Sequence, residues 1–283
     1  MNVTFDNLIN YANGGWGKLY CSEFVTSTEK DTDDISKSQT EIVAKWLCSP
    51  ISTRSTKSGD KTSNFKVFSG NIPRFFRGED DKRRSYNMIK SHSASHKTKG
   101  KPTDERQLAI KMLKSNRLLR PSPIGTIIDR EVPLYDHKYQ QTAEIDLISY
   151  DEATNRLYLL ELKRPNSKET LLRCILEIFT YFKTIGDKAK FLRDFTNESS
   201  PNHYIKGINS KTKFVLCPMI FNDAGRPMRD FKTIDSRYYL KKLISLISKD
   251  IRHANAALNI AIIDKNNSDN LADWETHVEP MIK

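Results

Sequence analysis

The sequence predicts an α/β protein in which helices flank a central mixed β-sheet, with an N-terminal extension. Three patterns predict this class. Two β-type runs, residues 143–150 and 157–163, are separated by turn formers and indicate a hairpin. A stretch with apolar residues at three-to-four spacing follows, and residues 213–221 then form a continuous apolar run. A hairpin, an amphipathic helix and a buried strand in this order are typical of an α/β chain.

The first part of the chain holds short apolar patches between polar stretches. Residues 40–47 predict a helix. Its expected apolar side consists of Ile42, Val43, Trp46 and Leu47. Residues 65–76 form a second patch, which fits either a strand or a segment packed under a loop. Residues 1–81 are therefore expected to form an α+β extension or a small domain.

A strongly basic stretch over residues 82–102 predicts a flexible linker, because it contains many Lys and Arg residues and few large apolar ones. It fits either an arm that contacts a polyanion or a solvated connector without a partner. The main domain is expected over residues 103–283.

Within that domain, residues 104–118 predict a helix that Thr103 can cap, and residues 124–134 predict a strand that leads to the hairpin. A helix is expected from residues 167–168 to about Ile185. Residues 213–221 then predict a buried strand, residues 238–251 an amphipathic helix and residues 258–263 a final short strand.

The hairpin places four charged residues on one face. With the turn centred between residues 153 and 154, Asp146 faces Glu161 and Glu144 faces Lys163. Two carboxylates about 5 Å apart repel by roughly 3 kcal/mol at an effective dielectric near 20. A divalent metal beside Lys163 would compensate this repulsion. Alternatively, the charged face is wet, and Glu144 and Lys163 form a surface ion pair.

This order of elements resembles the PD-(D/E)xK nuclease superfamily and its restriction-endonuclease-like core. The resemblance covers roughly residues 103–221. Its motif here is Ile145-Asp146 followed by Glu161-Leu162-Lys163. Ile145 replaces the proline of the nominal motif, which the chemistry does not require.

The resemblance implies a phosphodiesterase that uses Mg²⁺ or Mn²⁺. Asp146, Glu161 and the backbone carbonyl of Leu162 would hold the metal, and Lys163 would position the attacking water or help to deprotonate it. Many members also carry an acidic residue on the helix before the sheet, and Glu105 fits that place.

Four further residues are auxiliary candidates: Glu131, Glu144, Glu177 and Tyr181. Glu105 could instead stabilise the first turn of its helix, and Glu131 on the next strand is then the competing donor. Glu177 and Tyr181 resemble the Gln-x-x-x-Tyr feature of RecB-like members, with Glu in place of Gln. Glu177 could act on the site electrostatically, and Tyr181 also fits a core position.

The charge balance favours a polyanionic partner. Lys and Arg number 46 against 35 Asp and Glu, a net charge of +11. Solubility through excess lysine is the alternative reading. Nucleic acid is the expected partner, DNA before RNA, with flanking phosphates held by Arg164, Lys168 and Arg173. A homodimer or a partner protein could bind through the N-terminal region.

Other classes are disfavoured. The four cysteines show no CxxC spacing, and no Gly-rich nucleotide loop is present. No secretory signal is evident, and the longest apolar run is too short for a bilayer, so a cytoplasmic protein without membrane contact is expected.

The leading hypothesis is thus a metal-dependent nuclease that cuts DNA. The alternatives are a non-catalytic nucleic-acid-binding protein that retains the nuclease fold, and an interaction protein whose N-terminal hundred residues recruit a partner.

Overall fold

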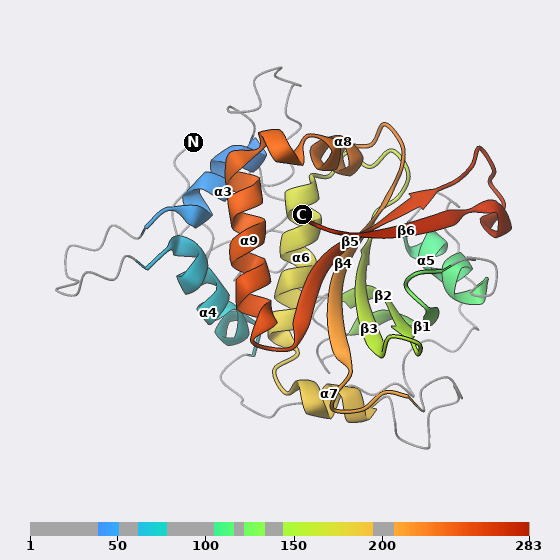
Figure 1. The fold of residues 1–283 in the computed structure, drawn as a ribbon, viewed down its shortest axis with the longest axis horizontal. Coiled ribbons are helices and arrows are strands. Elements are labelled where there is room, and N and C mark those ends of the chain that lie inside the picture. The colour runs from blue at the N-terminus through green and yellow to red at the C-terminus, as the bar shows by residue number, and fades with distance from the viewer. Residues whose placement is uncertain are drawn as a thin grey trace.

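A six-stranded open mixed sheet forms the centre of the computed structural model, which describes residues 39–50, 62–77, 105–115, 122–133, 144–194 and 207–282. The strands are β1 (Thr126–Pro133), β2 (Glu144–Asp151), β3 (Arg156–Leu162), β4 (Lys213–Phe221), β5 (Ala256–Asp264) and β6 (Glu275–Pro280). The helices are α3 (Gln39–Cys48), α4 (Asn64–Arg77), α5 (Glu105–Lys114), α6 (Leu171–Thr184), α7 (Lys188–Asp194), α8 (Arg226–Lys232) and α9 (Tyr238–Arg252). The helices α6 and α9 lie on one side of the sheet and α5 on the other (Figure 1).

The spatial order of the strands equals their order in the sequence. The first three strands form an antiparallel meander, β3, β4 and β5 pair in parallel, and β6 returns antiparallel to β5. Parallel neighbours need a long crossover, and α6 and α9 lie in the two crossovers. The predicted α/β class with a mixed sheet is confirmed, whereas the restriction-endonuclease-like character of the core stays a prediction.

The predicted hairpin register is confirmed. Leu147 pairs with Leu160 and Tyr150 with Leu157, which places the centre of the turn between residues 153 and 154. The side chain of Asp151 accepts hydrogen bonds from the backbone of Ala153 at 3.1 Å and from the hydroxyl of Thr154. Turn-forming side chains therefore fix which residues of the two strands oppose each other.

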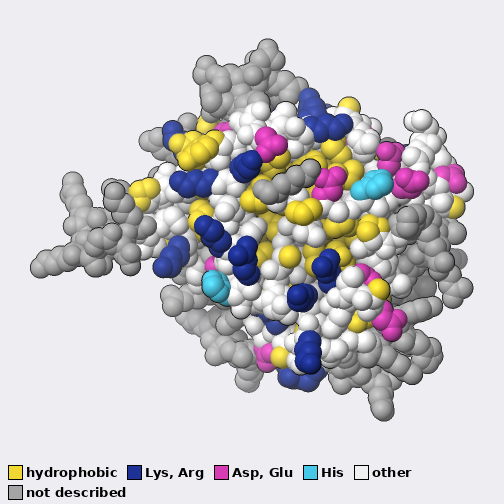
Figure 2. All heavy atoms as spheres, viewed as in Figure 1, with side chains coloured by type: hydrophobic (Ala, Val, Ile, Leu, Met, Phe, Trp, Pro, Cys, Tyr) yellow, Lys and Arg dark blue, Asp and Glu magenta, His cyan; other side chains and the backbone are white. Residues whose placement is uncertain are grey.

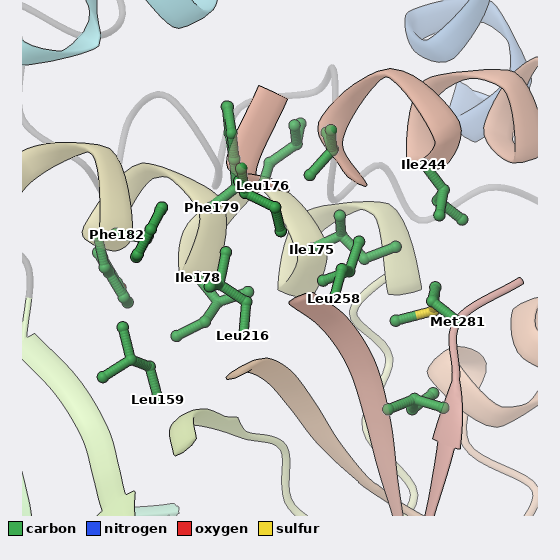
Figure 3. Packing of buried hydrophobic residues seen from close by; sticks show 14 of the residues in the cluster. Leu159, Ile175, Leu176, Ile178, Phe179, Phe182, Leu216, Ile244, Leu258 and Met281 are labelled. Carbon is green, nitrogen blue, oxygen red and sulfur yellow. The ribbon is translucent and has the colours of Figure 1, made fainter. Parts of the chain in front are cut away.

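The face of the sheet toward α6 carries the larger hydrophobic core. Figure 3 shows Leu159, Leu216 and Leu258 of three neighbouring strands facing Ile175 and Ile178 of α6. Each of these side chains is nearly or fully buried, which contributes about 1.5–3 kcal/mol per side chain. The packing fixes α6 against β3 and so fixes the polar groups at the ends of both elements.

The opposite face carries a second core. Leu108 and Met112 of α5 belong to one cluster with Leu147, Leu160 and Leu162 of the hairpin. Alternate residues of β2 and β3 thus serve the two faces, as expected for strands buried on both sides. The α5 core holds the start of α5 near the end of β3.

Two N-terminal helices belong to the larger core. Val43 and Leu47 of α3 and Phe65 and Phe68 of α4 cluster with residues of α6 and α9. In Figure 1 α3 and α4 lie beside α9, on its outer side. The predicted linker at 82–102 lies outside the described residues, but the helices before it and the domain after it share this core.

Four details differ from expectation. Residues 64–77 form helix α4, not a strand or a loop, with Phe65, Phe68 and Ile72 buried at helical spacing. Ile42 of α3 is 38% exposed, because the buried side of that helix is formed by Val43, Ala44 and Leu47.

The helix expected from residue 167 or 168 begins only at Leu171, because the Thr170 side chain accepts a hydrogen bond from Arg173 N and caps it. The last predicted strand is followed by another, β6. Within the described residues no helix is long and apolar enough to cross a bilayer.

Candidate active site

Asp146 is fixed against the strand that carries the Glu-x-Lys triplet. Its Oδ2 accepts a hydrogen bond from Leu162 N at 2.8 Å. The paired register from residue 147 onward makes Glu161 the next residue opposite Asp146. Glu161 and Lys163 share the α6 face of the sheet, because they alternate with Leu160 and Leu162, which serve the α5 core. Asp146 lies close enough to Lys163 for its charge to act on the Asp146 carboxyl group.

Lys163 is the buried centre of this group. The residue is 3% exposed, and its backbone N–H donates to Met219 O of β4 at 2.9 Å. Its Nζ lies 2.7 Å from Glu161 Oε1, 2.9 Å from Glu169 Oε2 and 3.2 Å from Glu177 Oε2. The charged side of the hairpin is therefore enclosed by protein, and three carboxylates surround one ammonium group.

Arg173 joins two of these carboxylates on α6. Its Nη1 lies 2.9 Å from Glu169 Oε1, and its Nε lies 2.9 Å from Glu177 Oε1. The spacing of four residues on a helix brings these side chains together. Arg173 was expected to hold a flanking phosphate, and the structure instead places carboxylates against its guanidinium.

Of the two competing acidic donors, Glu105 lies at this site. Its Oε1 accepts a hydrogen bond from Arg164 N at 3.1 Å. Glu131 lies elsewhere, in ion pairs with Arg106, at 2.6 Å, and with Arg130. The start of α5 thus adds a carboxylate beside the end of β3.

Burial raises the pKa of both opposed carboxyl groups, those of Asp146 and Glu161. Burial raises the pKa of Asp146 to about 7, although the nearby Lys163 opposes the rise. The pKa of Glu161 stands well above its ordinary value, first because of burial and second because of repulsion by Asp146. In the absence of a cation, protonation relieves the repulsion.

Lys163 is shifted in the direction that keeps it charged. Burial alone would lower its pKa, but Glu161 and Glu177 outweigh burial and hold the pKa well above its usual range. The pKa of Glu177 is lowered despite burial, because Lys163 and Arg173 stabilise its carboxylate. Lys163 is therefore a permanent cation near neutral pH.

Three carboxylate oxygens of the site are buried without a hydrogen-bond donor among the described residues. Those of Glu169 and Glu177 lie within 3.2 Å of Lys163 Nζ, whereas Glu161 Oε2 has no ion-pair partner in this part of the chain. The described residues contain no group of three or more His, Cys, Asp and Glu side chains arranged for a metal. The expected donor set is smaller, with the carboxylates of Asp146 and Glu161 and the carbonyl of Leu162. These are oxygen ligands only, which suits Mg²⁺ or Mn²⁺, so the residues present fit the ion.

Comparisons with known proteins give no relative. No family model, no curated protein and no solved structure matches this chain. The resemblance to PD-(D/E)xK nucleases therefore depends on the residues and the geometry described above.

The remaining predicted residues divide between the site and its surroundings. Arg164 and Lys168 are exposed beside it. Tyr181 follows Glu177 by one turn of α6 and is buried, and its pKa is raised well above the ordinary value by burial and then by Glu161. Glu144 is exposed at the start of β2.

Glu144 is not among the ion-pair partners of Lys163 in the described part of the chain. Nearby protein atoms partly desolvate the carboxyl group of Glu144 and raise its pKa, and Arg106 and Arg130 oppose that rise, so its charged neighbours are the cations of α5 and β1. The alternative of a wet face with an ion pair between Glu144 and Lys163 is not what the described residues show, because Lys163 is buried among Glu161, Glu169 and Glu177.

Glu169 is a site residue that sequence reasoning missed. It lies in the connection between β3 and α6, where no regular pattern marks it. The signal was its spacing of four residues from Arg173, which matches an ion pair across one helical turn.

Proposed function

We propose that this chain is a divalent-metal-dependent nuclease that hydrolyses phosphodiester bonds of DNA. The observation that carries the proposal is the hydrogen bond from Leu162 N to Asp146 Oδ2, 2.8 Å long. It sets Asp146 beside Glu161 and Lys163, the residues of the motif that resembles the PD-(D/E)xK superfamily.

Each residue has a role in this proposal. Asp146, Glu161 and the Leu162 carbonyl would hold Mg²⁺ or Mn²⁺, which, when bound, neutralises the carboxylates and activates water toward phosphorus. Lys163 would donate hydrogen bonds to the attacking water or to a phosphate oxygen and offset the negative charge that grows in the transition state. Its raised pKa makes it a donor and not a proton acceptor.

Glu105 positions the backbone of Arg164 through their 3.1 Å hydrogen bond. That contact fixes the exit of the chain from β3, where the exposed Arg164 and Lys168 would contact flanking phosphates. The wider surface fits a polyanion as well. Figure 2 shows Lys and Arg side chains spread over the face that carries α9, where Lys242, Lys249 and Arg252 are exposed.

Cleavage assays with site variants test the proposal. Plasmid, linear duplex and single-stranded DNA, and RNA, would be incubated with Mg²⁺ or Mn²⁺ and with EDTA. Asp146→Asn and Lys163→Ala should abolish cleavage, whereas Glu152→Gln, an exposed change in the β2–β3 turn, should leave it unchanged. Metal-dependent cleavage that persists in Asp146→Asn would remove the assignment.

A second candidate is a non-catalytic nucleic-acid-binding protein with this fold. The enclosure of Lys163 by three carboxylates favours it, because the amine already has partners within 3.2 Å. Titration calorimetry with Mn²⁺ separates the two functions. An absence of metal binding, together with DNA affinity that EDTA does not change, would favour the binder.

A cytoplasmic setting and a homodimer or partner-protein contact through the N-terminal region stay predictions from the sequence. A truncated chain that starts near residue 102 would also lack α3 and α4, which pack on α9 and α6. The role of the N-terminal region is therefore better tested by point substitutions than by truncation.

A further inference from the structure

Glu169 bridges the two cations of the candidate active site, the buried Lys163 and the partly buried Arg173. Its Oε2 lies 2.9 Å from Lys163 Nζ, and its Oε1 lies 2.9 Å from Arg173 Nη1. One carboxylate thus contacts both cations with its two oxygens. Two oxygens of a phosphodiester could contact the same pair in the same way, because carboxylate and phosphate are both bidentate partners of cations.

We propose that Lys163 and Arg173 form a phosphate-binding subsite, which Glu169 occupies until nucleic acid displaces its carboxylate. This inference rests on the proposed nuclease function, because it assigns the substrate phosphate to the same site. Glu169 is then a gating residue, since it competes with the substrate and does not touch the reacting atoms.

Among the three carboxylates around Lys163, Glu169 is the one suited to leave. Its side chain is 26% exposed, against 5% for Glu161 and 7% for Glu177. Glu161 lies on β3 and Glu177 inside α6, whereas Glu169 precedes Thr170, the residue that caps α6. Of the three side chains, that of Glu169 is the most exposed, so rotation about its own bonds is the shortest way for a carboxylate to leave.

The backbone around Glu169 is fixed, so the gate is a side-chain movement. Asn166 N donates to Asp223 Oδ2 at 2.6 Å, and Arg226 N donates to Ser167 O at 2.7 Å. Glu169 N donates to Ser167 Oγ at 3.3 Å. Rotamer changes of a partly exposed side chain are fast, so displacement of the carboxylate does not require the loop to open.

Charge explains why the carboxylate has to leave. Lys163 and Arg173 carry two positive charges, and a phosphate placed beside Glu169 would meet a negative group at contact distance. After displacement, Lys163 keeps Glu161 at 2.7 Å and Arg173 keeps Glu177 at 2.9 Å. Both cations therefore stay in position for the phosphate.

Binding of DNA in EDTA tests the gate without cleavage. Fluorescence anisotropy with a labelled short duplex would compare the wild type, Glu169→Gln and Glu152→Gln. The last is the matched control, because it removes the same charge from an exposed site in the β2–β3 turn. Glu169→Gln should bind about threefold to tenfold more tightly than the wild type, while Glu152→Gln should bind like the wild type. Unchanged or weaker binding by Glu169→Gln would overturn the gate.

A second set of variants keeps the test independent of one substitution. Glu169→Ala removes the whole carboxylate and should also tighten binding. The gain should disappear when Arg173→Gln is combined with Glu169→Gln, since the subsite then lacks one cation; a gain that survives would contradict the subsite. Circular dichroism would check the fold of each variant.

The outcomes separate this inference from the proposed function. Tighter binding by Glu169→Gln in a protein that does not cleave would overturn the hydrolytic function and support the subsite. If the wild type cleaves DNA in a metal-dependent manner but Glu169→Gln binds DNA no more tightly than the wild type, the gate alone is overturned.

Discussion

Glu41 and Leu240 lie 199 positions apart in the sequence, yet Glu41 Oε1 accepts a hydrogen bond from Leu240 N at 3.1 Å. Its Oε2 accepts a second bond from Tyr239 N at 3.0 Å. These N–H groups belong to the first turn of α9 and have no partner within the helix. A carboxylate of α3 therefore caps α9 and lies favourably at the positive end of its dipole.

Glu41→Ala should lower the free energy of unfolding by about 1–3 kcal/mol, because a buried and a partly buried donor lose their acceptor. Glu41→Gln should cost less, because its amide oxygen can still accept one bond. Urea denaturation followed by circular dichroism measures both changes. Glu152→Ala, exposed in the β2–β3 turn, is the control, and equal stability of Glu41→Ala and this control would contradict the capping role.

The hairpin register could be predicted because the information is local. Asp151, Ala153 and Thr154 form the turn, and the alternation of each strand then decides which residues oppose each other. Glu105 was placed by its position on the helix before the sheet. The predicted opposition of Asp146 and Glu161 needed no knowledge of the rest of the chain.

The partners of Lys163 could not be predicted in this way. Glu177 reaches the lysine only because α6 packs across the sheet, and Glu169 reaches it only because Thr170 delays the start of α6.

The edge strand β6 was missed for another reason. Its sequence is largely polar and charged, which is common for edges that must not pair with other chains but gives a weak strand signal.

Helix α4 shows how helix-breaking residues can mislead a prediction from the sequence. Gly70 and Pro73 disfavour a helix when read alone, and both lie inside α4. The buried residues Phe65, Phe68 and Ile72 carry the helical spacing, and packing against α6 outweighs the local preference.

Metal binding should strengthen as the pH rises. Asp146, with its pKa raised by burial to about 7, must lose its proton before it can bind a cation. We expect the deprotonation of Asp146 alone to raise the affinity for Mn²⁺ by up to about tenfold per pH unit below pH 7. Glu161, whose pKa is also raised well above its ordinary value, should make this rise steeper. Titration calorimetry between pH 6 and pH 8.5 measures this dependence.

The same shift predicts the pH dependence of stability without metal. A carboxyl group whose pKa is raised on folding binds its proton more tightly in the folded state, so Asp146 should make the fold less stable as the pH rises from about 4 to about 7. Asp146→Asn should reduce this loss and abolish the pH effect of that group on metal binding. If stability and Mn²⁺ affinity depended on pH in Asp146→Asn as they do in the wild type, both expectations would be contradicted.

Removal of the buried lysine should destabilise the fold strongly. Lys163→Met leaves Glu161 buried without a cation and leaves Glu177 with Arg173 alone, a type of change that costs about 3–5 kcal/mol. The double variant Lys163→Met with Glu161→Gln should regain part of the loss, because the carboxyl group that lost its cation is replaced by a neutral amide. Urea denaturation at pH 7.5 compares the two. A double variant less stable than Lys163→Met would show that the cost does not come from unpaired carboxylates.

Gly125 should be irreplaceable at the turn that leads into β1. Its φ is +73°, and an added Cβ would overlap the backbone of Tyr150 and Asp151 on the neighbouring strand. Gly125→Ala should therefore lower the free energy of unfolding by at least about 2 kcal/mol, through strain and through displacement of β1 from β2. Gly70→Ala is the matched control, because an added Cβ there meets nothing within 4 Å and the helix should gain about 0.5–1 kcal/mol. Thermal unfolding should thus move the two alanine variants in opposite directions, and a Gly125→Ala protein as stable as the wild type would contradict the described pairing of β1 with β2.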